Sequence, residues 1–122
     1  MGIELLDHVN INTRNLDACI RFYGEVLGFE NGPRPDFGFP GAWMYCGSQP
    51  VIHIMAMDSA PGGTTGPLDH VAFRCTGFEA IRDRLTESGL KFEQNVVPDF
   101  KIKQLFVRDP DGVKIELNFI GE

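Results

Sequence analysis

The sequence has little histidine, tryptophan or positive charge. Histidine occurs three times and tryptophan once in 122 residues, and 17 acidic residues outnumber 11 lysines and arginines. The formal net charge of −6 argues against a general nucleic-acid binder, because phosphate backbones need a basic surface. No apolar run approaches the roughly 20 residues needed to cross a bilayer. We therefore expect neither nucleic acid nor membrane as a partner.

Cysteine is also scarce. Cys19, Cys46 and Cys75 are odd in number and show no CxxC spacing, so a disulfide framework is not expected. The first residues lack a basic stretch followed by an apolar run, so no secretory signal is expected. These features favour a reducing compartment, and we expect a cytoplasmic protein whose cysteines serve as packing residues.

The chain repeats itself. Three short motifs recur in the same order, 62 or 63 residues apart: Leu6-Asp7-His8-Val9 with Leu68-Asp69-His70-Val71, Phe29-Glu30 with Phe92-Glu93, and Val51-Ile52-His53-Ile54 with Lys114-Ile115-Glu116-Leu117. Ordered matches at nearly one interval indicate duplication. We predict one domain, 1–122, made of module 1 (1–58), a glycine- and proline-rich linker (59–67) and module 2 (68–122).

Each half has the same order of expected elements: strand, helix, then three strands. In the first half these are 5–12, 16–27, a strand around Phe29, 42–46 and 51–57; in the second they are 70–74, a helix ending at Gly89, 91–96, 103–108 and 113–119. Asn15 is expected to cap the first helix, and Thr76 with Glu79 to form a capping box for the second. The predicted fold is α+β: two tandem βαβββ modules forming a cupped, mostly antiparallel sheet with helices outside.

Strand alternation brings four residues onto one kind of face. Val, Ile and Phe alternate with polar residues in the strands at 5–12, 51–57, 70–74 and 113–119, and the apolar faces should pack on the helices. His8, His53, His70 and Glu116 then occupy the uncovered face. Imidazole and carboxylate are usual ligands of one divalent metal ion, such as iron, manganese, nickel or zinc. The alternatives are hydrogen-bonded surface histidines and a solvated Glu116; His53 is either a fourth ligand or an acid/base beside the ion.

These motifs carry a family resemblance. Leu6–Val9, the segment Leu16–Phe29, Leu68–Val71 and Asp109–Leu117 together resemble the vicinal oxygen chelate superfamily. That superfamily includes glyoxalase I, bleomycin- and fosfomycin-resistance proteins, methylmalonyl-CoA epimerase and extradiol dioxygenases. Gly41-Ala42-Trp43, followed by Ile52-His53-Ile54, is similar to its glyoxalase I-like branch.

The resemblance implies a metal-dependent enzyme with ligands at His8, His70 and Glu116. The metal chelates neighbouring substrate oxygens, and lyase or isomerase chemistry moves a proton at carbon, with Glu116 and His53 as catalytic residues. Glyoxalase I has a Glu or Gln-type ligand where this chain has His53. An extradiol dioxygenase with iron(II), His8, His70 and Glu116 is an alternative that suits His53, but Phe106 stands where such enzymes carry tyrosine. A non-catalytic binding or resistance protein is the third possibility.

Several further residues are candidates for contact with a small-molecule substrate. Phe37, Phe39, Trp43 and Tyr45 would form an apolar wall or pack in the core. Asn10 and Arg74 would hold a carboxylate or hydroxyl, or serve as ordinary structural polar groups. Lys103 would meet an anionic substrate, or be an ordinary exposed lysine. By its size and resemblance the protein is expected to be a homodimer, and the metal ligands come either from one chain or from two.

Overall fold

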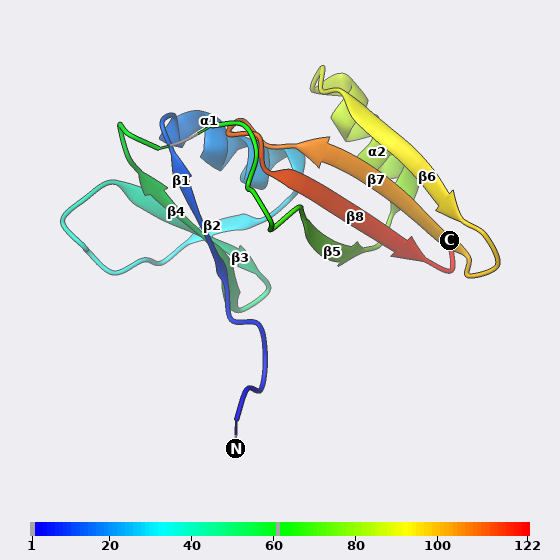
Figure 1. The fold of residues 1–122 in the computed structure, drawn as a ribbon, viewed down its shortest axis with the longest axis horizontal. Coiled ribbons are helices and arrows are strands. Elements are labelled where there is room, and N and C mark those ends of the chain that lie inside the picture. The colour runs from blue at the N-terminus through cyan, green and yellow to red at the C-terminus, as the bar shows by residue number, and fades with distance from the viewer. Residues whose placement is uncertain (1, 61) are drawn as a thin grey trace. The chain divides into compact units, whose positions relative to one another are not determined.

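A computed structural model describes residues 2–60 and 62–122, which form two compact units divided within the predicted linker (Figure 1). Each unit contains one of the two predicted modules. Position 61 of the linker and Met1 lie outside the described residues. That the two modules together make one domain stays a prediction.

The first module contains two helical segments and four strands. Its elements are β1 (Val9–Thr13), α1 (Leu16–Arg21), the π-helix η1 (Phe22–Val26), β2 (Glu30–Gly32), β3 (Gly41–Cys46) and β4 (Gln49–Ala56). The strands lie in the order β1-β4-β3-β2, with β1 parallel to β4 and the other pairs antiparallel.

The second module repeats this arrangement. Its elements are β5 (Val71–Cys75), α2 (Phe78–Glu87), β6 (Phe92–Val97), β7 (Ile102–Arg108) and β8 (Lys114–Ile120). The order is β5-β8-β7-β6, and the first and last strands are again parallel. The α+β class and the tandem βαβββ modules are therefore confirmed, with the strands in two four-stranded mixed sheets.

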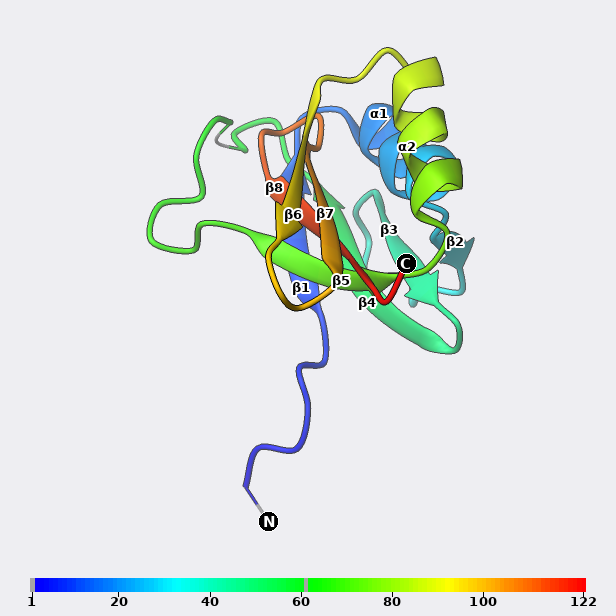
Figure 2. The ribbon, with the colours of Figure 1, turned by 90° about the vertical axis from the view of Figure 1, so that its right-hand side faces the viewer.

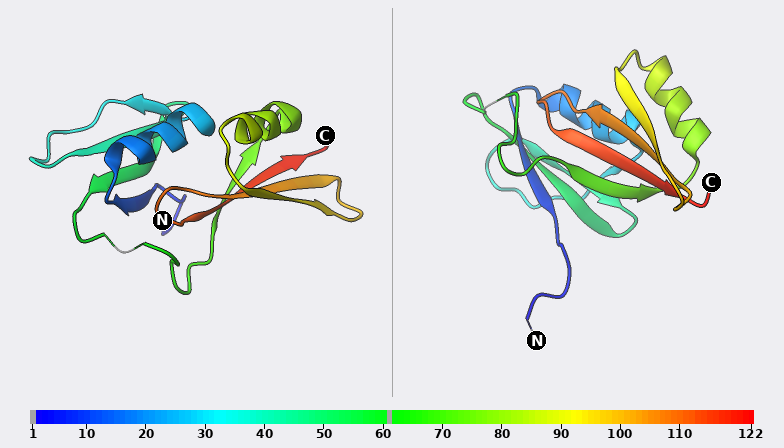
Figure 3. Two further views of the ribbon diagram at one scale, coloured as in Figure 1. Left: turned by 90° about the horizontal axis from the view of Figure 1, so that it is seen from above. Right: turned by 45° about the vertical axis from the view of Figure 1, so that its right-hand side comes forward.

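In each module the helix covers one face of its own sheet (Figures 2 and 3). The residues beneath the helices alternate along the strands as predicted, and nearly all are fully buried: Ala42, Met44, Ile52 and Ile54 in the first module, and Leu105, Val107, Ile115, Leu117 and Phe119 in the second. Their neighbours in sequence, including His53 and Glu116, consequently take the face without a helix.

The first strand of each module begins later than the alternation predicted. β1 starts at Val9 rather than at residue 5, and β5 starts at Val71, so His8 and His70 directly precede their strands. Leu5 and Leu6 are 77% and 74% exposed, because the segment before Val9 extends past the end of the sheet and finds no partner strand in its module (Figure 1).

The first helix begins as predicted and changes type halfway. Asn15 caps it, with its Oδ1 accepting a hydrogen bond from the Ala18 amide at 3.1 Å. From Phe22 the helix widens into a π-helical turn, and the Leu27 amide donates to the Phe22 carbonyl five residues back. The adjacent Phe22 and Tyr23, at the start of this wider turn, are both buried.

The predicted capping box of the second helix is wrong. The N-cap of α2 is Gly77, with a left-handed backbone at φ 82° and no capping side chain of its own. The Glu122 carboxylate accepts the Gly77 and Phe78 amides instead, each at 3.0 Å. A residue 44 positions away thus neutralises the positive end of the helix, a contact that no local motif reveals.

No helix of residues 2–60 and 62–122 has the length and apolar character to cross a membrane.

We expect Glu122→Ala to lower the free energy of unfolding by about 1 kcal/mol, because two helix amides lose their acceptor. Urea unfolding followed by circular dichroism measures this, and hydrogen exchange of the Gly77 and Phe78 amides should accelerate. The control is Glu87→Gln at the other end of α2, where losing a negative charge costs nothing. Unchanged stability and exchange in Glu122→Ala would refute the cap.

Candidate functional site

Each module brings two of the four predicted ligands together on its uncovered sheet face. In the first module, His8 directly precedes β1, and His53 lies on the neighbouring strand β4. Asn10 of β1 is the direct cross-strand partner of His53. The two imidazole rings are stacked, with centroids 3.7 Å apart and planes inclined by 11°. We call His8 and His53 the first pair.

The second pair is His70 and Glu116. Glu116 lies on β8, and its direct cross-strand partner is Ala72 of β5. His70 precedes Ala72 by two residues, just as His8 precedes Asn10, the partner of His53. The Nε2 atom of His70 is 3.5 Å from Oε1 of Glu116, whose side chain is 13% exposed. The repeat therefore places the pairs equivalently, with a carboxylate in place of one imidazole.

An aspartate directly precedes His8 and another directly precedes His70, and each aspartate orients the ring of its histidine. The Nδ1 atom of His8 is 2.6 Å from Oδ2 of Asp7, and that of His70 is 2.8 Å from Oδ2 of Asp69. A proton on Nδ1 donated to the carboxylate leaves Nε2 with its lone pair available, which is the tautomer that binds metals. The repeated Asp-His dipeptide is the sequence signal for this arrangement.

Asp69 has a second partner. Its pKa is lowered, first by the hydrogen bond with His70 and then by the charge of Lys114, whose Nζ lies 3.7 Å away. The carboxylate therefore stays ionised at neutral pH and remains an acceptor for the His70 ring.

A chain of amides holds the other oxygen of Glu116. Asn118 donates to Glu116 Oε2 at 2.8 Å, Gln104 donates to Asn118 Oδ1 at 3.1 Å, and Asn95 donates to Gln104 Oε1 at 2.8 Å. These residues are direct cross-strand neighbours on β6, β7 and β8. These amides fix the carboxylate so that Oε1 points to His70. Their arrangement depends on the register of β6, β7 and β8, which the sequence alone does not give.

His53 lies between two aromatic rings. Trp43 of β3, its direct strand partner, stacks on one face at 4.1 Å, and His8 stacks on the other. Its Nε2 atom is buried and has no hydrogen-bond partner among the described residues. Burial is the largest cause of a lowered pKa for His53; the charges of His8 and Arg34 lower it further, while the Pro50 backbone and Asp7 raise it. The ring is therefore a neutral base at pH 7.

The stack bears on whether His53 is a ligand or a base. Ring lone pairs lie in the ring plane, and the His8 and His53 planes are nearly parallel at a 3.7 Å centroid separation. Lone pairs in parallel planes do not converge on one point, so one ring must turn before both bind the same ion. The arrangement favours His53 as an acid/base beside the ligands.

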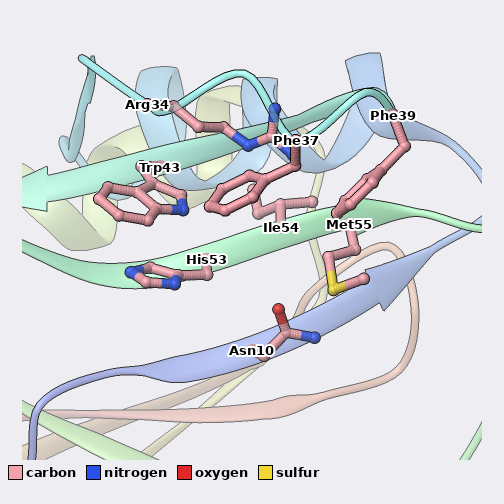
Figure 4. A pocket seen from close by; sticks show the side chains of 8 residues that line it. All are labelled: Asn10, Arg34, Phe37, Phe39, Trp43, His53, Ile54 and Met55. Carbon is pink, nitrogen blue, oxygen red and sulfur yellow. The ribbon is translucent and has the colours of Figure 1, made fainter.

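A cavity of about 180 Å³ opens beside His53 on the same face (Figure 4). Of the predicted substrate contacts, Asn10, Phe37, Phe39 and Trp43 line it, together with Met55 and Arg34. Arg34 was not predicted. Its position in Gly32-Pro33-Arg34-Pro35, just before the aromatic segment, was the available signal, because prolines stiffen the loop that carries it.

Other predicted substrate contacts lie elsewhere. Tyr45 donates its hydroxyl to the Pro33 carbonyl at 2.6 Å and packs on Gly32, so it anchors the loop that precedes β3. Lys103 pairs with the buried Phe119 and places Nζ 5.0 Å from the Phe78 ring, on the helix side of the sheet. Arg74 is exposed on the face of Glu116. We leave Tyr45 and Lys103 out of the proposed site.

The titration of His53 follows from its surroundings. In metal-free protein we expect an NMR titration of its imidazole with a midpoint below 6.5, because burial disfavours the cation. The unfolded chain then binds this proton more readily, so His53 lowers stability as the pH falls below 6.5 and has no effect well above it. The urea-unfolded protein is the reference. A folded midpoint at or above that of the reference would contradict the described environment.

Comparison with known proteins gives one consistent result. The profile of the glyoxalase/bleomycin resistance protein/dioxygenase superfamily matches residues 5–117. "Glyoxylase I 4" of Arabidopsis thaliana is 33% identical over 96% of this chain and 71% of its own length. A glyoxalase family protein from Enterococcus faecalis is 32% identical, with a TM-score of 0.74 over 97% of this chain and 99% of that one. A glyoxylase/bleomycin resistance protein/dioxygenase domain from Frankia sp. shares the fold at 24% identity and a TM-score of 0.80, over 99% and 95% of the two chains.

Proposed function

Because this chain belongs to the glyoxalase/bleomycin resistance protein/dioxygenase superfamily, we propose that it is a metal-dependent small-molecule enzyme of the glyoxalase I-like type. It would chelate two neighbouring substrate oxygens and catalyse lyase or isomerase chemistry through proton transfer at carbon. The observation that carries this is the aspartate-oriented histidine entering each module, in the second module beside Glu116. The similarity to "Glyoxylase I 4" supports the same reaction type.

One divalent ion would be held by His8, His70 and Glu116. Both histidines have Nδ1 occupied by a carboxylate and Nε2 left as the donor atom. Two atoms bound to one ion at 2.0–2.2 Å lie roughly 3.0–3.5 Å apart in tetrahedral or octahedral geometry. The 3.5 Å between His70 and Glu116 is already in that range, so the second pair fits a metal with little rearrangement.

The side chains proposed for this site would have separable tasks. A bound divalent ion polarises the oxygens that it chelates and so acidifies the adjacent carbon. His53, neutral and partnerless at Nε2, would accept the proton released there. Trp43 and His8 hold the ring of His53 in place from its two faces. Glu116, fixed by Asn118 on one oxygen, can exchange a proton through the other.

The extradiol dioxygenase is the second candidate. A three-ligand set of two histidines and one carboxylate with His53 as a separate base is the arrangement that such enzymes need. However, Phe106 lies directly opposite Glu116 on β7 and offers a bare ring where the resemblance requires a tyrosine hydroxyl. We therefore place proton-transfer chemistry first. Oxygen consumption with catechols would reverse that order.

Metal content tests the central claim. Elemental analysis of protein purified without chelators should find near one equivalent of a first-row metal, and Glu116→Gln should lose most of it because a neutral amide is a poor ligand. Nickel or zinc would favour the isomerase, and iron the dioxygenase. The control is Glu93→Gln on β6, an exposed carboxylate of the same module. Absence of metal from the wild type under replete conditions would refute the proposal.

The aspartates should tune metal affinity without binding metal. We expect Asp69→Asn to weaken binding about 10–100-fold, since an amide neither orients nor polarises the His70 ring as a carboxylate does. Competition with a chromophoric chelator measures the dissociation constant. Asp83→Asn on α2, an exposed aspartate paired only with its neighbour Arg82, is the matched control. Equal affinity in Asp69→Asn and the wild type would show that the carboxylate has no such role.

A further inference from the structure

The cavity in the first module contains a cation without a counter-ion. Arg34 lines it from the loop before β3 and is half-buried, yet no aspartate or glutamate of residues 2–60 and 62–122 lies within ion-pair distance of its guanidinium. The nearest acid along the loop, Asp36, uses its Oδ1 to accept the Gly38 amide and shape the turn. A permanent positive charge in a chain of net charge −6 is thus left unpaired at this site.

The guanidinium is held in place by its neighbours. Its carbon lies 4.9 Å from the centroid of Phe37 and 5.1 Å from that of Phe39, within the range of cation–π attraction. It also fills the space that a side chain at Gly41 would occupy, since a Cβ there would lie 2.7 Å from a terminal nitrogen of Arg34. These contacts position the charge while leaving its N–H groups without a carboxylate.

Four of the other lining residues are aromatic, and Asn10, Ile54 and Met55 complete the lining. Phe37 and Phe39 are stacked with centroids 5.8 Å apart, and Phe37 lies 6.2 Å from Trp43, which in turn stacks on His53. Figure 4 shows Arg34, Phe37 and Phe39 reaching from the loop toward Trp43, His53 and Met55 of the two strands. A flat apolar group can therefore contact several ring faces next to one guanidinium.

The size of the cavity, which is open to solvent on one side, sets the scale of the group that fits inside it. A cavity of about 150 Å³ holds one benzene molecule. The volume here is about 180 Å³, which suits a single ring with a short substituent. A guanidinium pairs with carboxylates and phosphates alike through two parallel hydrogen bonds. The planar carboxylate is the smaller of the two and is the one that fits beside a ring in this volume.

We propose that Arg34 anchors the carboxylate of a single-ring aromatic acid whose ring lies among Phe37, Phe39 and Trp43, next to His53. That this acid is the substrate rests on the proposed function; that it binds here rests on the cavity alone. The inference narrows the small-molecule substrate to an aromatic monocarboxylate and makes Arg34 its specificity-determining residue.

Trp43 provides the measurement, because it is the only tryptophan of the chain and lines the cavity. The probes are 4-nitrobenzoate and its neutral isostere 4-nitrobenzamide, which both quench tryptophan fluorescence on binding. Titrations use chelator-treated protein at pH 8, where His53 is neutral, so that the result is independent of any metal. N-acetyltryptophanamide corrects for collisional quenching, and only the saturable part counts as binding.

We expect wild-type protein to bind the benzoate at least about tenfold more tightly than the benzamide, and Arg34→Gln to abolish that preference. Arg14→Gln, which removes an exposed arginine of the same module that does not line the cavity, should retain it. Equal binding of the two probes to the wild type, or a preference that survives in Arg34→Gln, would overturn the inference.

If Arg34→Gln binds neither probe, Arg34→Lys decides, because it keeps the charge and most of the side-chain volume. A retained preference for the benzoate supports the inference, and equal binding of the two probes overturns it. The metal measurement is separate: a protein that prefers the benzoate but takes up no metal would keep this inference and refute the proposed function. A protein that binds metal but does not prefer the benzoate would keep the proposed function and refute this inference.

Discussion

The parallel pairing of the first and last strands within each module is the constraint on which the candidate site depends. It places the residue that precedes the first strand diagonally beside a residue three positions before the end of the pairing, so His8 meets His53 and His70 meets Glu116. Antiparallel neighbours alone would leave the N-terminal and C-terminal strands of a module at opposite edges of the sheet. The helix then determines which face these pairs occupy, because it covers the apolar one.

The two pairs are held by different forces, and this difference suits different chemistry. His53 is fixed by ring stacking and partial burial, which favour the uncharged imidazole. Glu116 is fixed by a chain of neutral amides, of which Asn118 donates a hydrogen bond to its carboxylate. One scaffold, used twice, thus holds a neutral imidazole in one copy and, in the other, the carboxylate that we propose as a metal ligand.

The order of elements, the boundaries of most strands and the uncovered face could be predicted from the sequence, because repeat and alternation are visible in it. Three features could not. The cap of α2 comes from Glu122, far along the chain, and overrides the local Thr76 and Glu79 pattern. The π-helical turn, in which the adjacent Phe22 and Tyr23 are both buried, departs from the regular 3.6-residue period that the apolar stripe predicted. Lys103 follows the alternation of Leu105 and Val107, but its charge favoured an exposed position. The strand register and its contact with the Phe78 ring show that it lies on the helix side.

Gly41 shows how the recess for Arg34 arises. A side chain at this position would collide with the Ile54 carbonyl of the neighbouring strand, so the strand pairing already requires glycine there. The space that receives the guanidinium therefore results from the backbone geometry. It does not require a core side chain to be given up for ligand binding. A chain of this architecture can acquire or exchange an anchoring group through the 33–40 loop alone, leaving the sheet that carries His53 unchanged. Substrate preference is then free to evolve separately from the residues proposed to perform the chemistry.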